Sequence, residues 1–363
     1  MGRAIHRSDP RAADTVVASC QHGGPAIGRS RRALSRADKH VSIAGPLTSA
    51  GPAASVEYDV ESDQLVIPYR IGLGTYGLGE RVEDRERDVE AVKQALNVGY
   101  RLIDTAEIYG QGGSESVIGE ALRAFGRRSE IFIVSKVDGS HSTHDGTVRA
   151  CEASIERMGC EYIDLYLLHG PEPRRFSETL SGFSELLRSG CVRHIGVSNF
   201  SVSDLEEWCT QARNLGVASP VACNQMPYSA DAPGIEHELL PYQREHGIQT
   251  MAYSPLGRGT LASHPTLVKL GKARGLTAAQ LALAWCLREP DIVVIPKSAD
   301  HRRIEENLRA ASVSLSLEEV EQIERSCGPS FRWLRRNAIL RRARSFGRGL
   351  LSKLKLPGLS GKR

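Results

Sequence analysis

Four residues that can exchange or stabilise a proton stand at or just beyond the ends of apolar segments. They are Asp104, Tyr109, Lys136 and His169. A buried charge is costly unless it is paired, so an aspartate and a lysine at neighbouring strand ends are expected to pair. A tyrosine beside that lysine has a stabilised phenolate, and we therefore expect the pKa of Tyr109 to fall. Such a phenol could protonate a carbonyl oxygen as a general acid, while His169 hydrogen-bonds the same oxygen and orients the substrate.

The segments around these residues alternate between short apolar runs and amphipathic stretches. The runs that predict strands are Arg101–Asp104, Ile131–Lys136, Ile163–Leu168, His194–Ser198, Val221–Gln225, Gln249–Tyr253, Ile292–Pro296 and Leu308–Val313. The stretches with helical periodicity are Asp88–Val98, Glu115–Phe125, Thr147–Met158, Glu178–Arg188, Ser203–Arg213, Glu236–His246, Ala278–Arg288 and Leu317–Arg325. Three helix starts carry capping boxes, Ser201 with Asp204, Thr277 with Gln280 and Ser316 with Glu319.

Eight apolar strands that each precede a helix predict a parallel sheet buried on both faces. Eight such units between residues 62 and 327 match the size of a single α/β domain of the (β/α)8 type, the TIM barrel. An open doubly wound sheet is the alternative. In a barrel, functional side chains gather at the carboxyl ends of the strands, where Asp104, Lys136 and His169 stand.

A glycine motif offers an alternative to the barrel, the dinucleotide-binding Rossmann fold. Gly72, Gly74 and Gly77 spell G-x-G-x-x-G, and Asp104 could act as the acidic ribose ligand of a Rossmann domain. The aspartate lies further from the glycines than the spacing of about 20 residues usual in that motif. A Rossmann domain also leaves Lys136 and His169 without a role, so we prefer the barrel.

Several longer stretches give the sequence a family resemblance. They are Gly-Leu-Gly-Thr-Tyr (72–76), Gly-Ser-Glu-Ser-Val-Ile-Gly-Glu-Ala-Leu (113–122), Ile-Gly-Val-Ser-Asn-Phe (195–200), Asn-Gln (224–225), Ala-Tyr-Ser-Pro-Leu-Gly (252–257) and Ile-Pro-Lys-Ser (295–298). With these stretches and the four ionisable residues in this order, residues from about 64 to 325 resemble an aldo-keto reductase. The resemblance implies a (β/α)8 barrel and the NADPH-dependent reduction of aldehydes or ketones to alcohols. It also implies that Asp104, Tyr109, Lys136 and His169 are the catalytic residues.

The resemblance further implies a set of contacts to the cofactor NADPH. Ser198, Asn199 and Gln225 would bind the nicotinamide carboxamide, Tyr253 would stack on the ring, and Gly74, Thr75 and Asp104 would lie at that end. Ser254 and Leu256 would hold the pyrophosphate. Lys297, Ser298 and Arg303 match the site for the adenosine 2′-phosphate, with Glu306 and Asn307 at the adenine. Two cations and a hydroxyl suit a dianionic phosphate, and no metal is implied.

The substrate side departs from the family. Gly170 stands where an aromatic residue often follows the catalytic histidine, and the segment after Tyr253 is short. We expect an open pocket with broad selection of small carbonyl substrates. Tyr76, together with Tyr109 and His169, is a candidate substrate contact, and Phe331 or Trp333 could form a further apolar wall.

Charge divides the chain into three parts, residues 1–57, 58–327 and 328–363. The first lacks apolar periodicity and is expected to be a disordered extension. Residues 325–363 hold 12 basic and no acidic residues, whereas residues 58–324 hold 27 basic and 39 acidic ones. The basic character therefore belongs to the ends, and we expect no specific nucleic-acid binding by the barrel. The tail could contact a membrane or another polyanion.

The remaining features favour a monomeric enzyme of the cytoplasm. No secretory signal or membrane span is recognisable. The eight cysteines form no C-x-x-C pair, which is typical of free thiols in a reducing compartment. An alternative is an NADP-binding, redox-sensing subunit with slow turnover, and the same site run backwards would be an alcohol or sugar dehydrogenase.

Overall fold

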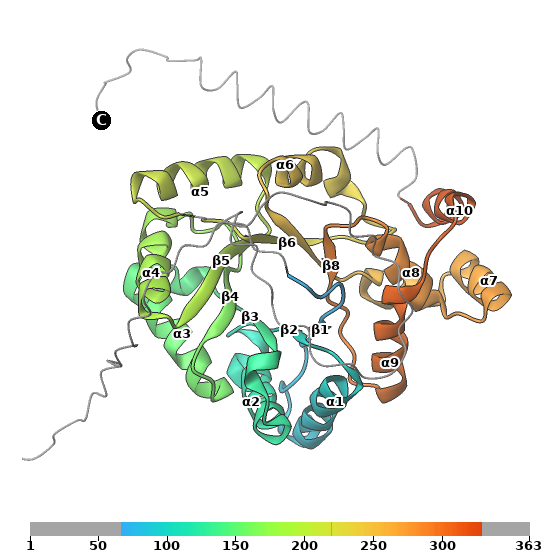
Figure 1. Ribbon diagram of the computed structural model, residues 1–363, viewed down its shortest axis with the longest axis horizontal. Helices are drawn as coiled ribbons and strands as arrows, with labels where there is room; N and C mark the ends of the chain where they lie inside the picture. The colour runs from blue at the N-terminus through green and yellow to red at the C-terminus, as the bar shows by residue number, and fades with distance from the viewer. Residues whose placement is uncertain (1–66, 219, 329–363) are drawn as a thin grey trace, which may run out of the picture. The chain divides into compact units, whose positions relative to one another are not determined.

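The elements of the computed structural model follow a repeating strand–helix order, and the structure describes residues 67–218 and 220–328 (Figure 1). The 1–57 extension, the tail beyond residue 328, and Phe331 and Trp333 lie outside these residues. The strands are β1 (Leu73–Gly74), β2 (Leu102–Asp104), β3 (Phe132–Val137), β4 (Ile163–Leu168), β5 (Val192–Ser198), β6 (Cys223–Pro227), β7 (Gln249–Tyr253) and β8 (Ile292–Val294). The helices are α1 (Arg85–Val98), α2 (Gly113–Phe125), α3 (His144–Met158), α4 (Phe176–Ser189), α5 (Val202–Asn214), α6 (Leu239–Glu245), α7 (Pro265–Arg274), α8 (Ala278–Leu287), α9 (His301–Arg309) and α10 (Leu317–Cys327).

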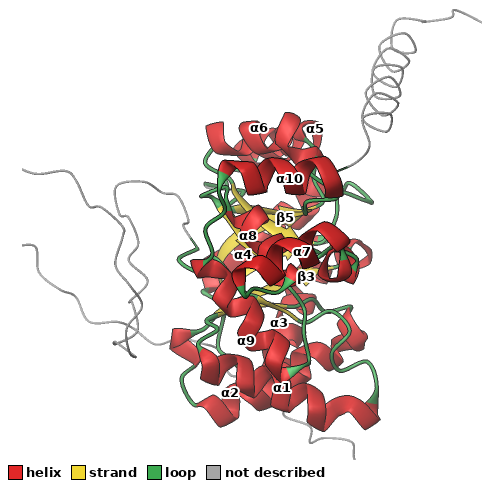
Figure 2. Ribbon diagram, turned by 90° about the vertical axis from the view of Figure 1, so that its right-hand side faces the viewer, coloured by secondary structure: helices red, strands yellow, loops and turns green. Residues whose placement is uncertain are grey.

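The eight strands form one parallel sheet in sequence order, and its first and last strands close it into a barrel. Ile71 forms a parallel bridge with Val294, and Gly74 forms one with Lys297. The Gly72 amide donates to the Val294 carbonyl at 2.8 Å. The helices surround the strands, as the side view in Figure 2 also shows. The predicted (β/α)8 barrel is therefore confirmed, and the open sheet and the Rossmann domain are wrong.

One predicted strand is wrong, and one was missed. Leu308–Val313 is the end of α9 followed by a short 3-10 helix, where Ile304 and Leu308 lie one helical turn apart on the face toward the core. A short apolar run cannot be assigned to strand or helix by its pattern alone. The missed strand is the two-residue β1, because its sequence is glycine-rich. The helix α7 was also not predicted from the sequence.

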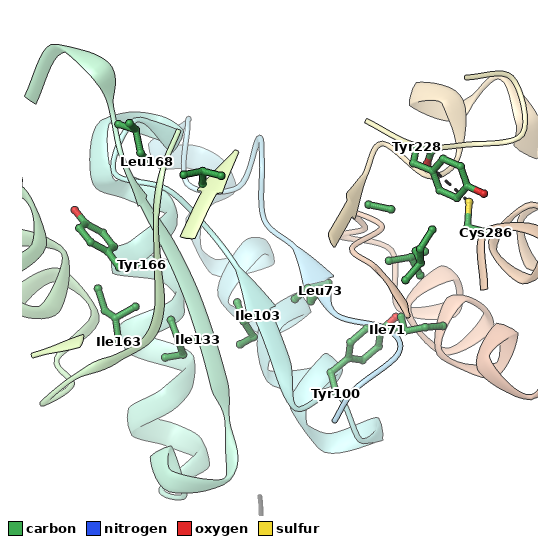
Figure 3. Close-up of a cluster of buried hydrophobic side chains, with 14 of the residues drawn as sticks. Ile71, Leu73, Tyr100, Ile103, Ile133, Ile163, Tyr166, Leu168, Tyr228 and Cys286 are labelled. Atoms are coloured by element: carbon green, nitrogen blue, oxygen red, sulfur yellow. Dashed lines mark hydrogen bonds between the residues drawn. The ribbon is translucent and has the colours of Figure 1, made fainter. Parts of the chain in front are cut away.

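Side chains along each strand point alternately into the barrel and out toward the helices, and this alternation forms two apolar layers. Leu102, Val134 and Leu167 point into the barrel, where they form a small inner cluster with Met251 and Val293. The alternate residues face outward and pack against the helices; Ile103, Ile133, Tyr166 and Leu168 belong to this larger cluster (Figure 3). Since side chains two residues apart share a face, residues 104, 136 and 169 continue the inner rows at the carboxyl end of the barrel.

Three helix starts agree with their sequence signals. All three predicted capping boxes are present: Ser201 with Asp204 at α5, Thr277 with Gln280 at α8, and Ser316 with Glu319 at α10. None of the described helices has the length and apolar character needed to cross a bilayer.

Candidate active site

A buried ion pair lies at the carboxyl end of the barrel. Lys136 Nζ donates to Asp104 Oδ1 at 2.8 Å and to the Thr105 carbonyl at 2.6 Å. The Lys136 side chain is 0% exposed and that of Asp104 is 4% exposed. Burial by itself lowers the pKa of Lys136, but the Asp104 carboxylate and the nearby Tyr109 phenol outweigh it and raise that pKa. The pairing predicted from the two strand ends is present, and Lys136 carries its proton.

Further hydrogen bonds hold Asp104 in place. Gln225 Nε2, on β6 across the barrel, donates to Asp104 Oδ1 at 2.6 Å. Thr75 Oγ1 donates to the Asp104 carbonyl at 2.9 Å, and the Ser114 hydroxyl donates to Thr75 Oγ1 at 2.8 Å. All four side chains are buried. This network fixes the carboxylate before any ligand arrives.

Tyr109 lies over this pair, half-buried at the start of the 3-10 helix that precedes α2. Lys136 Nζ donates to the Tyr109 hydroxyl at 3.4 Å. The Tyr109 ring makes edge contacts with Tyr76, at a centroid distance of 5.2 Å, and with His169, at 5.8 Å. The exposed Tyr76 thus stands on the outer side of the phenol, at 68% exposure.

The predicted direction of the Tyr109 pKa is wrong. Burial raises the pKa of Tyr109, Lys136 lowers it only in part, and the Asp104 carboxylate raises it again. The loss of water around the phenol and the anion behind the lysine together outweigh the lysine cation. Tyr109 is consequently protonated at neutral pH.

His169 directly follows β4 and makes an edge contact with the Tyr109 ring. Burial and the Lys136 cation lower its pKa to about 4, against a smaller opposing effect of Asp138. The imidazole is therefore neutral at physiological pH. Its Nδ1 atom is buried and has no hydrogen-bond partner among the described residues. A neutral imidazole offers one N–H donor and one acceptor to a ligand.

Amide and hydroxyl groups gather at the ends of β5, β6 and β7. Ser198 Oγ donates to the Gln225 carbonyl at 2.9 Å, and Asn199 Nδ2 contacts Ser198 Oγ at 3.0 Å and the His169 carbonyl at 3.0 Å. The Tyr253 hydroxyl donates to Asn199 Oδ1 at 2.8 Å. Asn199 adopts a φ of 64°, a left-handed conformation that asparagine tolerates better than most residues. This cluster can recognise a carboxamide beside an aromatic face.

A groove of about 1060 Å³ runs from Tyr109 and His169 to the first turn of α9. Nearly all residues assigned to the cofactor by resemblance line it; they are Gly74, Asp104, Ser198, Asn199, Gln225, Tyr253, Ser254, Leu256, Lys297, Ser298, Arg303, Glu306 and Asn307. Thr75 does not line the groove but lies behind it, against Asp104. The structure thus brings the predicted residues together along one continuous surface.

The far end of this groove is cationic. Lys297 and Arg303 are exposed, and their side chains form no ion pair or hydrogen bond with any other residue in the described ranges. Asp300 caps α9 by accepting from the Arg303 amide at 2.9 Å, and the Ser298 hydroxyl accepts from the Asp300 amide at 3.1 Å. Unpaired cations at a helix start are well placed to bind a phosphate.

Sequence reasoning missed two arginines of the groove. Arg258 lies on the loop after β7 with a φ of 56°, and Arg302 precedes Arg303 on α9, where it pairs with Glu306 at 3.4 Å. No residue spacing signals Arg258, since the fold alone brings its loop to the groove. The basic pair Arg302–Arg303 is visible in the sequence, but only the helix orientation shows that both reach the groove.

The described residues offer no metal site or disulfide. They contain no group of three histidine, cysteine or acidic side chains placed to hold an ion. All seven cysteines in the described part of the chain are free.

A closed parallel barrel with a buried Asp–Lys pair beneath a tyrosine and a histidine defines a class of barrel oxidoreductases, and comparison with known proteins identifies the family. The model of the aldo/keto reductase family matches residues 70–327, and the chain belongs to that family. Methylglyoxal reductase YeaE of Escherichia coli (strain K12) is 35% identical over 262 residues, which cover 70% of this chain and 90% of the relative. Glyoxal reductase of Bacillus subtilis (strain 168) is 36% identical over 251 residues, covering 69% and 87% respectively. An aldo/keto reductase from Klebsiella pneumoniae, solved with NADP and acetate, superimposes with a TM-score of 0.67 at 36% identity, covering 72% of this chain and 92% of that one.

Proposed function

We propose that this protein reduces aldehydes or ketones to alcohols with NADPH, and that Tyr109 supplies the proton. The observation that carries the proposal is the position of the Tyr109 hydroxyl, 3.4 Å from a lysine that is itself paired with Asp104 at 2.8 Å. Family membership supports carbonyl reduction in general. Two of the relatives are named for the reduction of small dicarbonyl compounds, methylglyoxal and glyoxal.

The groove fits NADPH by the chemistry of its two ends. Ser198, Asn199 and Gln225 would hold the carboxamide, with Tyr253 against the ring. Lys297 and Arg303, whose side chains form no ion pair or hydrogen bond with the described residues, would hold the 2′-phosphate. When bound there, NADPH supplies the hydride that reduces the carbonyl carbon.

The side chains of the site would donate the proton and stabilise the charge that remains. Tyr109 stays protonated at neutral pH because burial raises its pKa, so it can donate to the carbonyl oxygen as that oxygen gains charge. The Lys136 ammonium then stabilises the phenolate left behind, and Asp104 keeps that ammonium charged and fixed. Neutral His169 would donate a hydrogen bond to the same oxygen and set the orientation of the substrate. The balanced reaction consumes one carbonyl, one NADPH and one proton.

Steady-state oxidation of NADPH, followed by its absorbance, tests the proposal. Purified protein should oxidise NADPH on addition of methylglyoxal, glyoxal or a simple benzaldehyde, and the alcohol should form in equal amount. Reactions without aldehyde or without protein are the controls. Absence of turnover with every member of a panel of aldehydes, ketones and sugars would show that the site is not a working reductase.

A further inference from the structure

A second cavity, of about 540 Å³, opens beside the groove between the loops that follow β2, β3 and β4. It is lined by Ile108, Asp138, Gly139, Ser140, His169, Gly170, Pro171, Glu172 and Pro173. His169 and Ile108 line both cavities. If the carbonyl group of a substrate lies at Tyr109 and His169, the rest of the substrate can therefore extend into this cavity.

The walls of this cavity carry negative charge. Asp138 accepts hydrogen bonds from the amide and the hydroxyl of Ser140, at 3.0 and 2.7 Å. Burial would raise the pKa of Asp138, but these hydrogen bonds outweigh it and lower that pKa, so the carboxylate is ionised at neutral pH. Glu172 is exposed on the opposite loop. No lysine or arginine is among the described residues that line the cavity.

The basic residues nearest to the cavity along the chain do not line it, since Lys136 is buried against Asp104 and Arg175 is exposed outside the lining. Arg174 forms ion pairs with Asp204 and Glu207, and His141 lies 3.1 Å from the Glu107 carboxylate. Neutral His169 adds no charge. An anionic group entering the cavity would thus meet two acidic side chains and no lysine or arginine among the described residues of its lining.

Two glycines shape the cavity: one allows two of its loops to touch, and the other leaves free space in it. A Cβ on Gly139 would lie 2.2 Å from the Glu172 carbonyl oxygen, so the two loops touch through a residue without a side chain. A Cβ on Gly170 would meet nothing within 4 Å. The absence of a side chain at Gly170 leaves space directly beside His169.

We propose that this second cavity receives the body of the carbonyl substrate, and that Asp138 and Glu172 select neutral or cationic carbonyl compounds over carboxylated ones. The inference rests on the proposed reductase function and adds the charge class of its substrate. Each of the two carboxylates acts over several ångströms in a partly exposed site. Each should therefore change the ratio of kcat/KM for a charged substrate to that for a neutral one by about three- to tenfold.

Three benzaldehydes with different para substituents test the selection, namely the anionic 4-carboxy, the neutral 4-nitro and the cationic 4-trimethylammonio compounds. The measured quantity is the ratio of kcat/KM for the charged compound to that for the neutral one, because the electronic effect of each substituent cancels between wild type and variant. Asp138→Asn combined with Glu172→Gln should raise the carboxy-to-nitro ratio by about tenfold and lower the trimethylammonio-to-nitro ratio. Asparagine can still accept the Ser140 hydrogen bonds, so the loop should keep its shape.

The matched control is Glu161→Gln, an exposed acid that precedes β4 and so lies toward the opposite end of the barrel. It removes one charge and should leave both ratios unchanged. In the wild type, added salt should raise the carboxy-to-nitro ratio by screening. Gly170→Phe should instead lower kcat/KM for all three compounds by filling the cavity.

The outcomes separate this inference from the function on which it rests. If none of the three aldehydes is reduced, both are overturned. If they are reduced but neither the double variant nor salt changes the ratios, the charge selection is overturned and the reductase stands. If Gly170→Phe has no effect on any of them, the substrate body lies outside this cavity.

Discussion

Removing the two unpaired cations of the groove should change the choice between NADPH and NADH. The Lys297 and Arg303 side chains form no hydrogen bond or ion pair with the described residues, so Lys297→Ala with Arg303→Ala removes no such bond there. A hydrogen bond to a charged group contributes about 1.5–3 kcal/mol. Both side chains are exposed, so we take a combined loss of roughly 1.5–3 kcal/mol, discounted for solvent screening. That loss corresponds to a rise of about 10- to 150-fold in the Kd for NADPH.

Fluorescence titration of the protein with NADPH and with NADH measures this effect directly. The Kd for NADH should stay within about twofold of the wild-type value, since NADH lacks the 2′-phosphate. Lys269→Ala with Arg309→Ala removes the same charge from exposed positions outside the groove, and should leave both affinities unchanged. Equal losses for NADPH and NADH in the Lys297/Arg303 variant would refute the assignment of the 2′-phosphate site.

Four further predictions concern Tyr109, His169, Lys136 and the basic tail. Tyr109→Phe should lower kcat by about 100-fold or more with little change in cofactor Kd, and retention of half the wild-type kcat would exclude the phenol as the acid. Because the pKa of His169 is lowered to about 4, a plot of kcat/KM against pH should show no histidine inflection between pH 5.5 and 7.5; an inflection near 6.5 that His169→Gln removes would contradict this. Lys136→Met should destabilise the fold by roughly 3–5 kcal/mol by leaving Asp104 buried without its partner, and adding Asp104→Asn should restore much of the loss in thermal unfolding. If the basic tail binds anionic surfaces independently, deleting residues 329–363 should keep activity and abolish salt-sensitive sedimentation with anionic vesicles; failure of the full chain to bind vesicles at low salt would exclude that role.

Much of the site could be predicted from the sequence because its residues sit at fixed steps along local elements. Asp104 and Lys136 each stand two residues beyond an apolar residue of the same inner row, Leu102 and Val134. Strand alternation therefore turns both toward the barrel axis, and their pairing follows from the cost of leaving either charge alone. The capping box at Ser201 is equally local, since both of its hydrogen bonds join residues three positions apart.

Other features were decided by contacts between residues far apart in the chain. β1 is a strand because Leu73 and Gly74 pair with β2 and because the Gly72 and Gly74 amides bond to the chain beside β8. The more apolar run after Ile304 packs instead as a helix end. The pKa of Tyr109 rises because the folded chain removes water from the phenol, an effect that no residue pattern measures. Arg258 reaches the groove through the path of its loop. The sequence by itself determined the strand faces, the three capped helix starts and the residue types of the candidate site, because these depend on neighbours a few positions away. Barrel closure, burial and the charge of each cavity needed the tertiary structure, because they depend on which distant residues share one space.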